Sequence, residues 1–210
     1  MVSLPFFTVG LTGGIASGKS VVSDALAQRG ANIVDTDVLA REVVAPETDG
    51  HAAVVSAFGK AIVQDDGELD RGALRRLVFA DSQQRKTLES IVHPRIGALA
   101  LQRLNEPAKD AYHVLVVPLM AGSAMRQWVH RIVSVECVAE TQMRRLLSRD
   151  GADIQTANGV IAAQADNQTR RRLADDIVNN DGSLQQLLGH AERLHRLYFV
   201  TSRQFQASNH

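Results

Sequence analysis

A glycine-rich segment near the N-terminus constrains the fold of this chain more than any other part of its sequence. Residues Gly13–Ser20 match the pattern G-x-x-x-x-G-K-[ST] without a mismatch. The glycines let the backbone curl so that successive N–H groups point at phosphate oxygens, and the helix beginning near Lys19 adds its positive end. In such a loop the lysine reaches the β- and γ-phosphates, and the hydroxyl of Ser20 ligates Mg²⁺. The sequence therefore predicts a site for a nucleoside triphosphate.

The residues around this loop form the pattern that a phosphate-binding loop requires. An apolar run over residues 6–12 precedes it, as a buried parallel strand would. The segment Val21–Arg29 follows with apolar residues at helical spacing and stops at Gly30, and Ile33–Asp35 is a second predicted strand. Strand, loop, helix and strand make a βαβ unit with a right-handed crossover. This context argues against an accidental match of the motif.

The rest of the chain predicts helices, then strands, then helices again. Between Thr36 and Leu104 we expect mainly helices, including one that starts at Asp81-Ser82, is interrupted at His93-Pro94 and resumes to Leu104. An arginine-rich helical stretch lies between Glu140 and Arg172, with a break at Asp150-Gly151. Ser183 caps a last helix. Further short strands are predicted at Val114–Val117, Ile132–Val135 and Ile177–Val178.

These elements predict an α/β fold, a parallel β-sheet core flanked by helices, in a single domain of residues 1–210. We expect the core at about residues 5–60, 110–140 and 173–206. A helical insertion is expected at about 61–109, and a helical lid at about 141–172.

Composition limits the partners and the compartment. The 23 Lys+Arg residues balance 23 Asp+Glu residues, so no global field collects nucleic acid or an anionic membrane. The longest apolar stretch, Val114–Gly122, is far short of the roughly 20 residues that cross a bilayer. Cys137 is the single cysteine, which excludes an internal disulfide and a C-x-x-C redox motif. No basic segment precedes Phe6-Phe7, so we expect a cytoplasmic protein without a secretory signal.

Two carboxylates follow the second predicted strand. Asp35 and Asp37 stand at its carboxyl end, where parallel sheets bind ligands. One carboxylate would accept the proton of an acceptor hydroxyl while the other orients water or Mg²⁺. Arg41, four residues beyond Asp37, reaches back on the same helical face to a substrate phosphate. The alternative is that either aspartate merely caps the next helix, but the neighbouring phosphate loop favours a functional role for at least one.

Arginines are concentrated in the predicted lid. Arg144, Arg145 and Arg149 fall on one helical stretch, and Arg170–Arg172 follow later. Phosphoryl transfer spreads negative charge over the transferred group, and a closing flap with a guanidinium neutralises that charge while excluding water. For Arg170–Arg172 we favour the simpler interpretation of a solvated helix face. Asn180 is either a residue that borders the adenine or a turn residue.

In its motifs and their order the chain resembles the dephospho-CoA kinases from about residue 8 to residue 200. The first of these motifs is common to many kinases, whereas the Asp-x-Asp, His-Pro and Ile-Ala-Ala-Gln motifs together are more specific. The residues that carry the resemblance are Thr12–Ser20, Val34–Asp37 with Ala40-Arg41, Val92–Pro94, Val116–Leu119, Ile161–Ala165, Ala174–Asp176, Asn180 and Gly182-Ser183.

The resemblance implies transfer of the ATP γ-phosphate to the ribose 3′-hydroxyl of dephospho-CoA, the last step of coenzyme A synthesis. It implies Asp37 as the base toward that hydroxyl and Lys19 as a further catalytic residue. Among the lid arginines we expect Arg145 to be the transition-state contact, with Arg149 as the second choice. Mg²⁺ would be held at Ser20. The acceptor would be bound by the insertion and by Thr12, Asp37, Arg41, His93, Pro118 and Leu119. The nucleotide would be bound by Gly14, Ile15, Ala16, Ser17, Gly18, Lys19, Ser20, Val21, Arg149 and Asn180.

The chain departs from the family pattern at two places. Leu119–Gly122 lacks the acidic residue that commonly follows the Val-Val-Pro motif, and Ala16 and Val21 replace a frequent glycine and threonine. Two alternatives therefore stay open at the level of the sequence. One is a nucleoside or nucleotide kinase of the same fold, and the other is an ATP-binding regulatory module that has lost catalysis. The sequence leaves self-association open.

Overall fold

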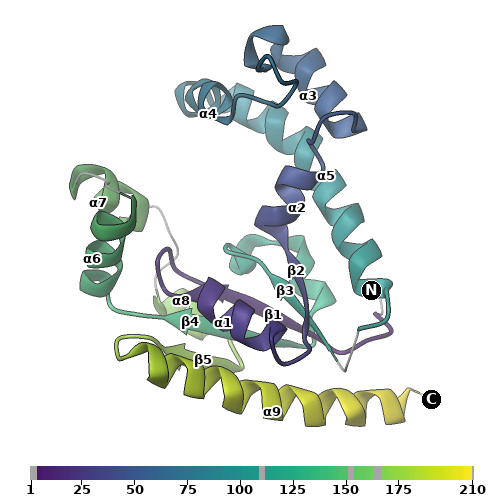
Figure 1. Cartoon of the computed structure of the whole chain (residues 1–210), viewed down its shortest axis with the longest axis vertical. Coiled ribbons are helices and arrows are strands. Elements are labelled where there is room, and N and C mark those ends of the chain that lie inside the picture. The colour runs from purple at the N-terminus through teal and green to yellow at the C-terminus, as the bar shows by residue number, and fades with distance from the viewer. Residues whose placement is uncertain (1–3, 109–111, 151–153, 163–166, 210) are drawn as a thin grey trace. The chain divides into compact units, whose positions relative to one another are not determined.

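The chain folds into two units, which are described one at a time. The computed structural model describes residues 4–108, 112–150, 154–162 and 167–209 (Figure 1). One unit comprises the residues up to Asp35 and from Leu104 onward, and we call it the sheet unit. The other, Thr36–Arg103, is the helical unit. The helical unit thus starts at Thr36, so that residues 36–60, assigned to the core from the sequence, group with the helices.

Five parallel strands make up the sheet, in the order β2-β3-β1-β4-β5. The strands are β1 (Thr8–Gly13), β2 (Asn32–Asp35), β3 (His113–Val116), β4 (Arg131–Glu136) and β5 (Asp176–Asn179). Every residue of β1 is buried, as the continuous apolar run predicts for a central parallel strand. Its last residue, Gly13, pairs with Val135 of β4. The predicted α/β fold with a parallel sheet is confirmed, and the loop after its central strand lies between two neighbouring strand ends.

Two helices of the sheet unit pack on one another and on the sheet. They are α1 (Lys19–Ala27) and α9 (Leu184–Ser208), and Ser183 starts α9 with a capping box completed by Gln186. Their apolar residues join those of the strands in one core, which includes Val9, Leu11, Val22, Leu26, Leu187, Ala191 and Tyr198. Full burial of one large apolar side chain stabilises a fold by about 1.5–3 kcal/mol. Because β1 and α1 both pack into this core, the two ends of the loop between them are fixed in position.

Edge strand β5 is fastened by polar groups as well as by packing. Arg131 of β4 donates to both carboxylate oxygens of Asp176, from Nε at 2.6 Å and from Nη2 at 3.0 Å. The Tyr198 hydroxyl on α9 donates to the same carboxylate at 2.9 Å. Burial, with the Asp176 charge second, raises the pKa of Tyr198 well above its ordinary value, so this hydroxyl keeps its proton.

A buried tryptophan closes the segment between β3 and β4. The short helices η2 (Met120–Gly122) and η3 (Ala124–Trp128) occupy this segment. Met120 and Trp128 are both buried there, and the indole Nε1 of Trp128 is enclosed without a hydrogen-bond partner in the part of the chain that the structure describes. Leaving a buried N–H unsatisfied costs about 1–3 kcal/mol, which the packing of the large indole ring offsets.

The remaining helices of the sheet unit correspond to the predicted lid. They are α6 (Ala139–Asp150), α7 (Ile154–Ala162) and α8 (Asn167–Arg171), and α6 packs against α7. Helix α6 ends at Asp150, where the sequence predicted a break. Residues 163–165 of the Ile-Ala-Ala-Gln motif lie outside the described residues.

The helical unit corrects one prediction. Its helices are α2 (Thr36–Glu42), α3 (Asp49–Phe58), η1 (Lys60–Ile62), α4 (Arg71–Ala80) and α5 (Ser82–Asn105). Helix α5 runs through Pro94, so the interruption expected at His93-Pro94 is wrong. Proline removes one backbone hydrogen bond, but the next turn buries Ile96 and Ala100, and the Arg95 guanidinium donates to the Ile91 carbonyl at 2.7 Å. Packing therefore carries the helix past the proline.

Among the described helices, none combines the length and the apolar character that a membrane span needs.

Candidate active site

The phosphate loop lies between the buried end of β1 and the first turn of α1. Gly18 precedes α1 with φ 99°, in the left-handed region that side chains avoid, and a Cβ at Gly18 would collide with the amide of Asn180. Ala16 has φ 53° in the same loop. A left-handed residue other than glycine costs roughly 1–2 kcal/mol, so Ala16 takes this conformation at a cost that the surrounding contacts offset.

Two polar groups of the loop fit an anion. The Lys19 ammonium lies 2.9 Å from the carbonyl oxygens of Gly13 and of Gly14, which places its charge at the mouth of the loop. The Ser17 hydroxyl is buried and has no hydrogen-bond partner among the described residues. A buried hydroxyl usually donates a hydrogen bond to an acceptor. A phosphate oxygen bound in the loop could accept the hydrogen bond of Ser17. Ser20, at the start of α1, is exposed and presents an oxygen of the kind that Mg²⁺ prefers.

Helix α6 contacts this loop through two side chains. Gln142 Nε2 donates to the carbonyl of Ile15 at 2.9 Å. Arg145 donates from Nη1 to the carbonyl of Ala16 at 3.1 Å and from Nη2 to the carbonyl of Asn180 at 2.9 Å. Leu146, one residue on, is buried. Gln142, Arg145 and Leu146 are spaced i, i+3, i+4, so one face of α6 meets the loop.

Asn180 links the loop to the residues that follow β5. Its Nδ2 donates to the Ser17 carbonyl at 2.7 Å, and its own carbonyl accepts from Arg145. Asn180 is buried, and burial is compatible with both of the roles that its sequence position allowed. The structure thus brings Ser17, Gly18, Arg145 and Asn180 together at the phosphate loop.

The second arginine cluster of the lid also reaches the loop. Arg170 of α8 is buried, and its Nη2 lies 3.3 Å from the position that a Cβ on Gly14 would occupy. The interpretation of Arg170–Arg172 as a solvated face is therefore wrong for Arg170, while Arg171 and Arg172 are exposed. Neither Gln142 nor Arg170 was predicted as a site residue. The spacing of Gln142 to Arg145 was a usable signal, but nothing in three consecutive arginines marks the buried one.

Several positive charges gather beside this loop. Burial, together with the charge of Asp181, raises the pKa of the Cys137 thiol, whereas the charges of Arg145, Arg170 and Lys19 act on that pKa in the opposite direction. One position at the carboxyl end of β4 thus feels the fields of all three cations. Because these cations come from α1, α6 and α8, the chain's zero net charge conceals a local site for a highly anionic ligand.

The acceptor-side residues of the sheet unit stand at the end of β3. The Thr12 hydroxyl donates to the carbonyl of Pro118 at 3.1 Å, which joins β1 to the segment after β3. Leu119 is 64% exposed, while Met120 beside it is buried. Ala121 and Gly122 are exposed and bring no carboxylate to this segment. The structure therefore places Thr12, Pro118 and Leu119 together.

The other predicted acceptor residues belong to the helical unit. Asp37 lies in the first turn of α2, directly after β2, and Arg41 lies one turn later, and both are exposed. His93 is exposed on α5. The backbone of Arg149 belongs to α6, but its side chain lies outside the described residues. No group of three or more metal-ligating histidine, cysteine, aspartate or glutamate side chains forms among the residues that the structure describes.

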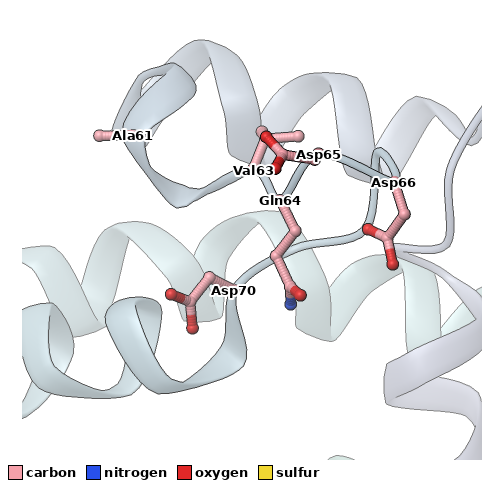
Figure 2. A pocket seen from close by; sticks show the side chains of 6 residues that line it. All are labelled: Ala61, Val63, Gln64, Asp65, Asp66 and Asp70. Carbon is pink, nitrogen blue, oxygen red and sulfur yellow. The ribbon is translucent and has the colours of Figure 1, made fainter.

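A pocket of about 440 Å³ within the helical unit is lined by acidic side chains, in contrast to the cations beside the phosphate loop. Figure 2 shows three carboxylates around Gln64, from Asp65, Asp66 and Asp70. Asp70 caps α4 by accepting from the N–H of Ala73 at 2.9 Å. Because three negative groups line it, this pocket repels phosphate, and it is not a candidate for the nucleotide.

Comparison with known proteins gives a consistent result over most of the chain. The dephospho-CoA kinase family matches residues 7–186. A dephospho-CoA kinase of Xanthomonas euvesicatoria is 46% identical over 199 residues, which cover 93% of this chain and 97% of the relative. One of Aromatoleum aromaticum is 40% identical, with coverage of 94% and 96%.

Solved structures agree on the fold. The crystal structure of a Thermus thermophilus protein has a TM-score of 0.76 at 30% identity and covers 90% of this chain and 95% of its own. A dephospho-CoA kinase of Campylobacter jejuni has a TM-score of 0.65 at 19% identity, with coverage of 91% and 97%. Together with the loop of Gly13–Ser20 and the cations around it, these matches show that the chain belongs to the dephospho-CoA kinase family and catalyses the final step of coenzyme A biosynthesis.

Proposed function

We propose that the chain transfers the γ-phosphoryl group of Mg²⁺-ATP to the ribose 3′-hydroxyl of dephospho-CoA, by way of the residues described above. The observation that carries this proposal is the phosphate loop itself. Lys19 stands at its mouth, Ser17 offers a buried hydroxyl, and Arg145 and Asn180 hold its backbone. Family membership supplies the acceptor. We also propose a cytoplasmic location, in line with the family's biosynthetic role.

The nucleotide is held by the loop residues from Gly14 to Val21. Their N–H groups and the positive end of α1 bind phosphate oxygens, and Lys19 binds the β- and γ-phosphates. Ser20 would hold Mg²⁺, which when bound neutralises charge on the phosphate oxygens. Asn180 and Arg149 border the nucleotide. A low-dielectric setting with fixed N–H donors needs little reorganisation during the reaction, which is the main source of rate in phosphoryl transfer.

The family resemblance assigns acceptor binding to Thr12, Pro118 and Leu119 and, further along the chain, to Asp37, Arg41 and His93. Asp37 accepts the proton of the 3′-hydroxyl. The hydroxyl oxygen forms a bond to the γ-phosphorus, and the bond from that phosphorus to the β,γ-bridging oxygen breaks. The electron pair stays on the bridging oxygen, and ADP leaves. Arg145 stays the predicted transition-state contact, because it lies on the lid helix at the loop.

An acceptor panel tests the proposal. The purified chain is incubated with Mg²⁺-ATP and with dephospho-CoA, a nucleoside or a nucleoside monophosphate, and ADP formation is measured. We expect the wild-type chain to form ADP with dephospho-CoA. For Lys19→Ala we expect kcat to fall on the order of 10²–10³-fold. For Asp37→Asn we expect a loss on the order of 10²–10⁴-fold. Asp65→Asn removes an exposed carboxylate of the same helical unit and serves as the matched control.

Two outcomes would overturn the proposal. A nucleoside monophosphate that outperforms dephospho-CoA indicates a nucleotide kinase of the same fold. ATP binding without acceptor-dependent ADP, unchanged by Asp37→Asn, indicates a binding module that has lost catalysis.

A further inference from the structure

The three consecutive arginines at the end of α8 stand in three different environments. Arg170 is 8% exposed, the Arg171 side chain is 53% exposed and ion-paired, and Arg172 is exposed. Consecutive residues on a helix point about 100° apart, so adjacent arginines cannot share a face. Each of the three therefore needs its own explanation.

Arg171 fixes α8 on the end of the sheet. Its Nε donates to Oε2 of Glu136 at 2.7 Å, and Glu136, the last residue of β4, is only 1% exposed. The Ser134 hydroxyl donates to the other oxygen of this carboxylate at 3.2 Å. Asn167, at the start of α8, donates from Nδ2 to the carbonyl of Cys137 at 3.2 Å. Both ends of this short helix are thus tied to the carboxyl end of β4, beside which α8 lies in Figure 1.

This attachment places Arg170 against the phosphate loop. Glu136 follows Val135, which pairs with Gly13 at the start of the loop. From α8 the Arg170 guanidinium reaches Gly14, with Nη2 at 3.3 Å from a Cβ built there, and it donates to Oδ1 of Asn167. Gly14 is the first residue after β1, and the Lys19 ammonium lies 2.9 Å from its carbonyl oxygen. Two cations therefore stand at Gly14.

Arg145 stands at a different part of the loop. Its nitrogens meet the carbonyls of Ala16 and Asn180, near the start of α1. Arg145 thereby joins the loop to the residues after β5, whereas Arg170 and Lys19 both lie near Gly14. A guanidinium at the latter point is suited to the outermost phosphate, because Lys19 is the residue that reaches the β- and γ-phosphates.

We propose that Arg170 binds the γ-phosphate of ATP and stabilises its charge during transfer, and that Arg171 is the positioning residue that holds Arg170 there through Glu136. This inference rests on the proposed function for the identity of the nucleotide. It gives the three arginines three roles: a phosphate contact at Arg170, an anchor at Arg171 and a solvated charge at Arg172.

Nucleotide binding measured by titration calorimetry tests this inference without turnover. The probes are the Mg²⁺ complex of β,γ-imido ATP, which keeps three phosphates, and ADP, which has two. For Arg170→Ala we expect binding of the imido analogue to weaken by roughly 10–100-fold, the range of a charge-assisted hydrogen bond, and ADP by less than about threefold. Arg172→Ala is the matched control and should leave both affinities unchanged.

Kinetic measurements extend the same comparison. With dephospho-CoA as acceptor, Arg170→Ala should lower kcat on the order of 10²–10³-fold, as for other lost charge-stabilising donors. Arg170→Lys should recover part of the loss, because it keeps the charge but not the forked geometry. Arg171→Ala should show the same selective loss for the imido analogue, smaller in size, and Arg171→Lys should restore it. Arg170→Gln, neutral and nearly as long, replaces the alanine variant if that variant fails to fold.

The outcomes separate this inference from the proposed function. Equal losses for the imido analogue and ADP, or no loss for either, would overturn the role of Arg170. If the wild type phosphorylates no dephospho-CoA but the imido analogue still depends on Arg170, the acceptor assignment fails and the phosphate contact stands. If the wild type forms coenzyme A and Arg170→Ala matches it in binding and turnover, the phosphate contact fails and the acceptor assignment stands.

Discussion

Helices α6 and α8 each bring an arginine to the phosphate loop, but they attach to the sheet unit in different ways. Arg145 comes from the twelve-residue α6, and the loop itself, together with Asn180, supplies its acceptors. Arg170 comes from the five-residue α8, which is held on β4 by Asn167 and by the Glu136–Arg171 pair. Too short to be stable alone, α8 depends on these polar contacts. An arginine on a long helix can shape a loop directly, whereas one on a short helix needs a neighbour as an anchor.

The largest expected effect comes from removing both arginines. Arg145 holds the loop and is the predicted transition-state contact, while Arg170 is proposed to hold the γ-phosphate, so their losses multiply. We expect Arg145→Ala/Arg170→Ala to lower kcat/KM by at least on the order of 10³–10⁴-fold. Arg145→Ala alone should weaken ADP and the imido analogue alike, unlike Arg170→Ala. A double-mutant cycle in kcat/KM measures the coupling. A double variant no slower than Arg170→Ala would show that both guanidiniums act on one group.

The anchor predicts a loss of stability. Arg171→Ala leaves the buried Glu136 carboxylate without its cation, which we expect to lower the free energy of unfolding by about 1–3 kcal/mol. Arg172→Ala should stay within about 0.5 kcal/mol of the wild type, as exposed substitutions usually do. Urea unfolding followed by circular dichroism measures both. Equal stability of the two variants would count against an anchoring role for Arg171.

The Cys137 thiol reports whether α8 stays in place. Cys137 is buried, its carbonyl accepts from Asn167 of α8, and burial raises the pKa of the thiol. Since only the thiolate reacts, the alkylation rate should rise about tenfold per pH unit between about pH 7 and 8.5, without a plateau. In Arg171→Ala, α8 should detach more easily from β4. If the free energy of the local opening that exposes Cys137 falls by about 1.4 kcal/mol, the alkylation rate at fixed pH should rise roughly tenfold. Reaction with iodoacetamide followed by mass spectrometry measures it, and a plateau below pH 8 would contradict the raised pKa.

The smallest expected effect concerns the loop beside which both arginines lie. Ala16→Gly relieves the left-handed backbone at Ala16, a gain of roughly 1–2 kcal/mol, but gives the unfolded chain more freedom, a loss of about 0.5–1 kcal/mol. The net stabilisation should be about 0.5 kcal/mol, visible as a small rise in Tm. Since Arg145 binds the Ala16 carbonyl rather than its side chain, the affinity for ADP should not change. A weaker affinity would mean that the alanine methyl group itself shapes the loop.

The sequence predicted the elements whose residues repeat with a clear period or carry turn signals. The strands ending at Gly13, Asp35 and Glu136 lie within two residues of their predicted bounds, and Ser183 caps α9 as expected. The phosphate loop was predictable because its chemistry requires a fixed order of glycine, lysine and serine.

Features that depend on tertiary packing were not predictable. Helix α5 passes through Pro94 because residues beyond it, such as Ile96, are buried, and no local pattern reveals that burial. The three consecutive arginines of α8 are indistinguishable in sequence. Arg170 is the buried one because α8 is attached to β4 through the Arg171–Glu136 ion pair. Gln142 could have been found from its spacing to Arg145, whose own position was expected from the family resemblance.

The buried indole of Trp128 gives the sheet unit a tryptophan fluorescence signal that the helical unit lacks. Trp128 is the single tryptophan of the chain, and it and both tyrosines, Tyr112 and Tyr198, belong to the sheet unit. The helical unit holds phenylalanine as its only aromatic residue type. Emission excited at the tryptophan band therefore reports on the surroundings of one residue of the sheet unit, and the enclosed ring should emit at a short wavelength that moves red when those surroundings open. Far-ultraviolet ellipticity follows the helices of both units, so comparing the two signals shows whether helix is lost together with the opening around Trp128 or separately from it.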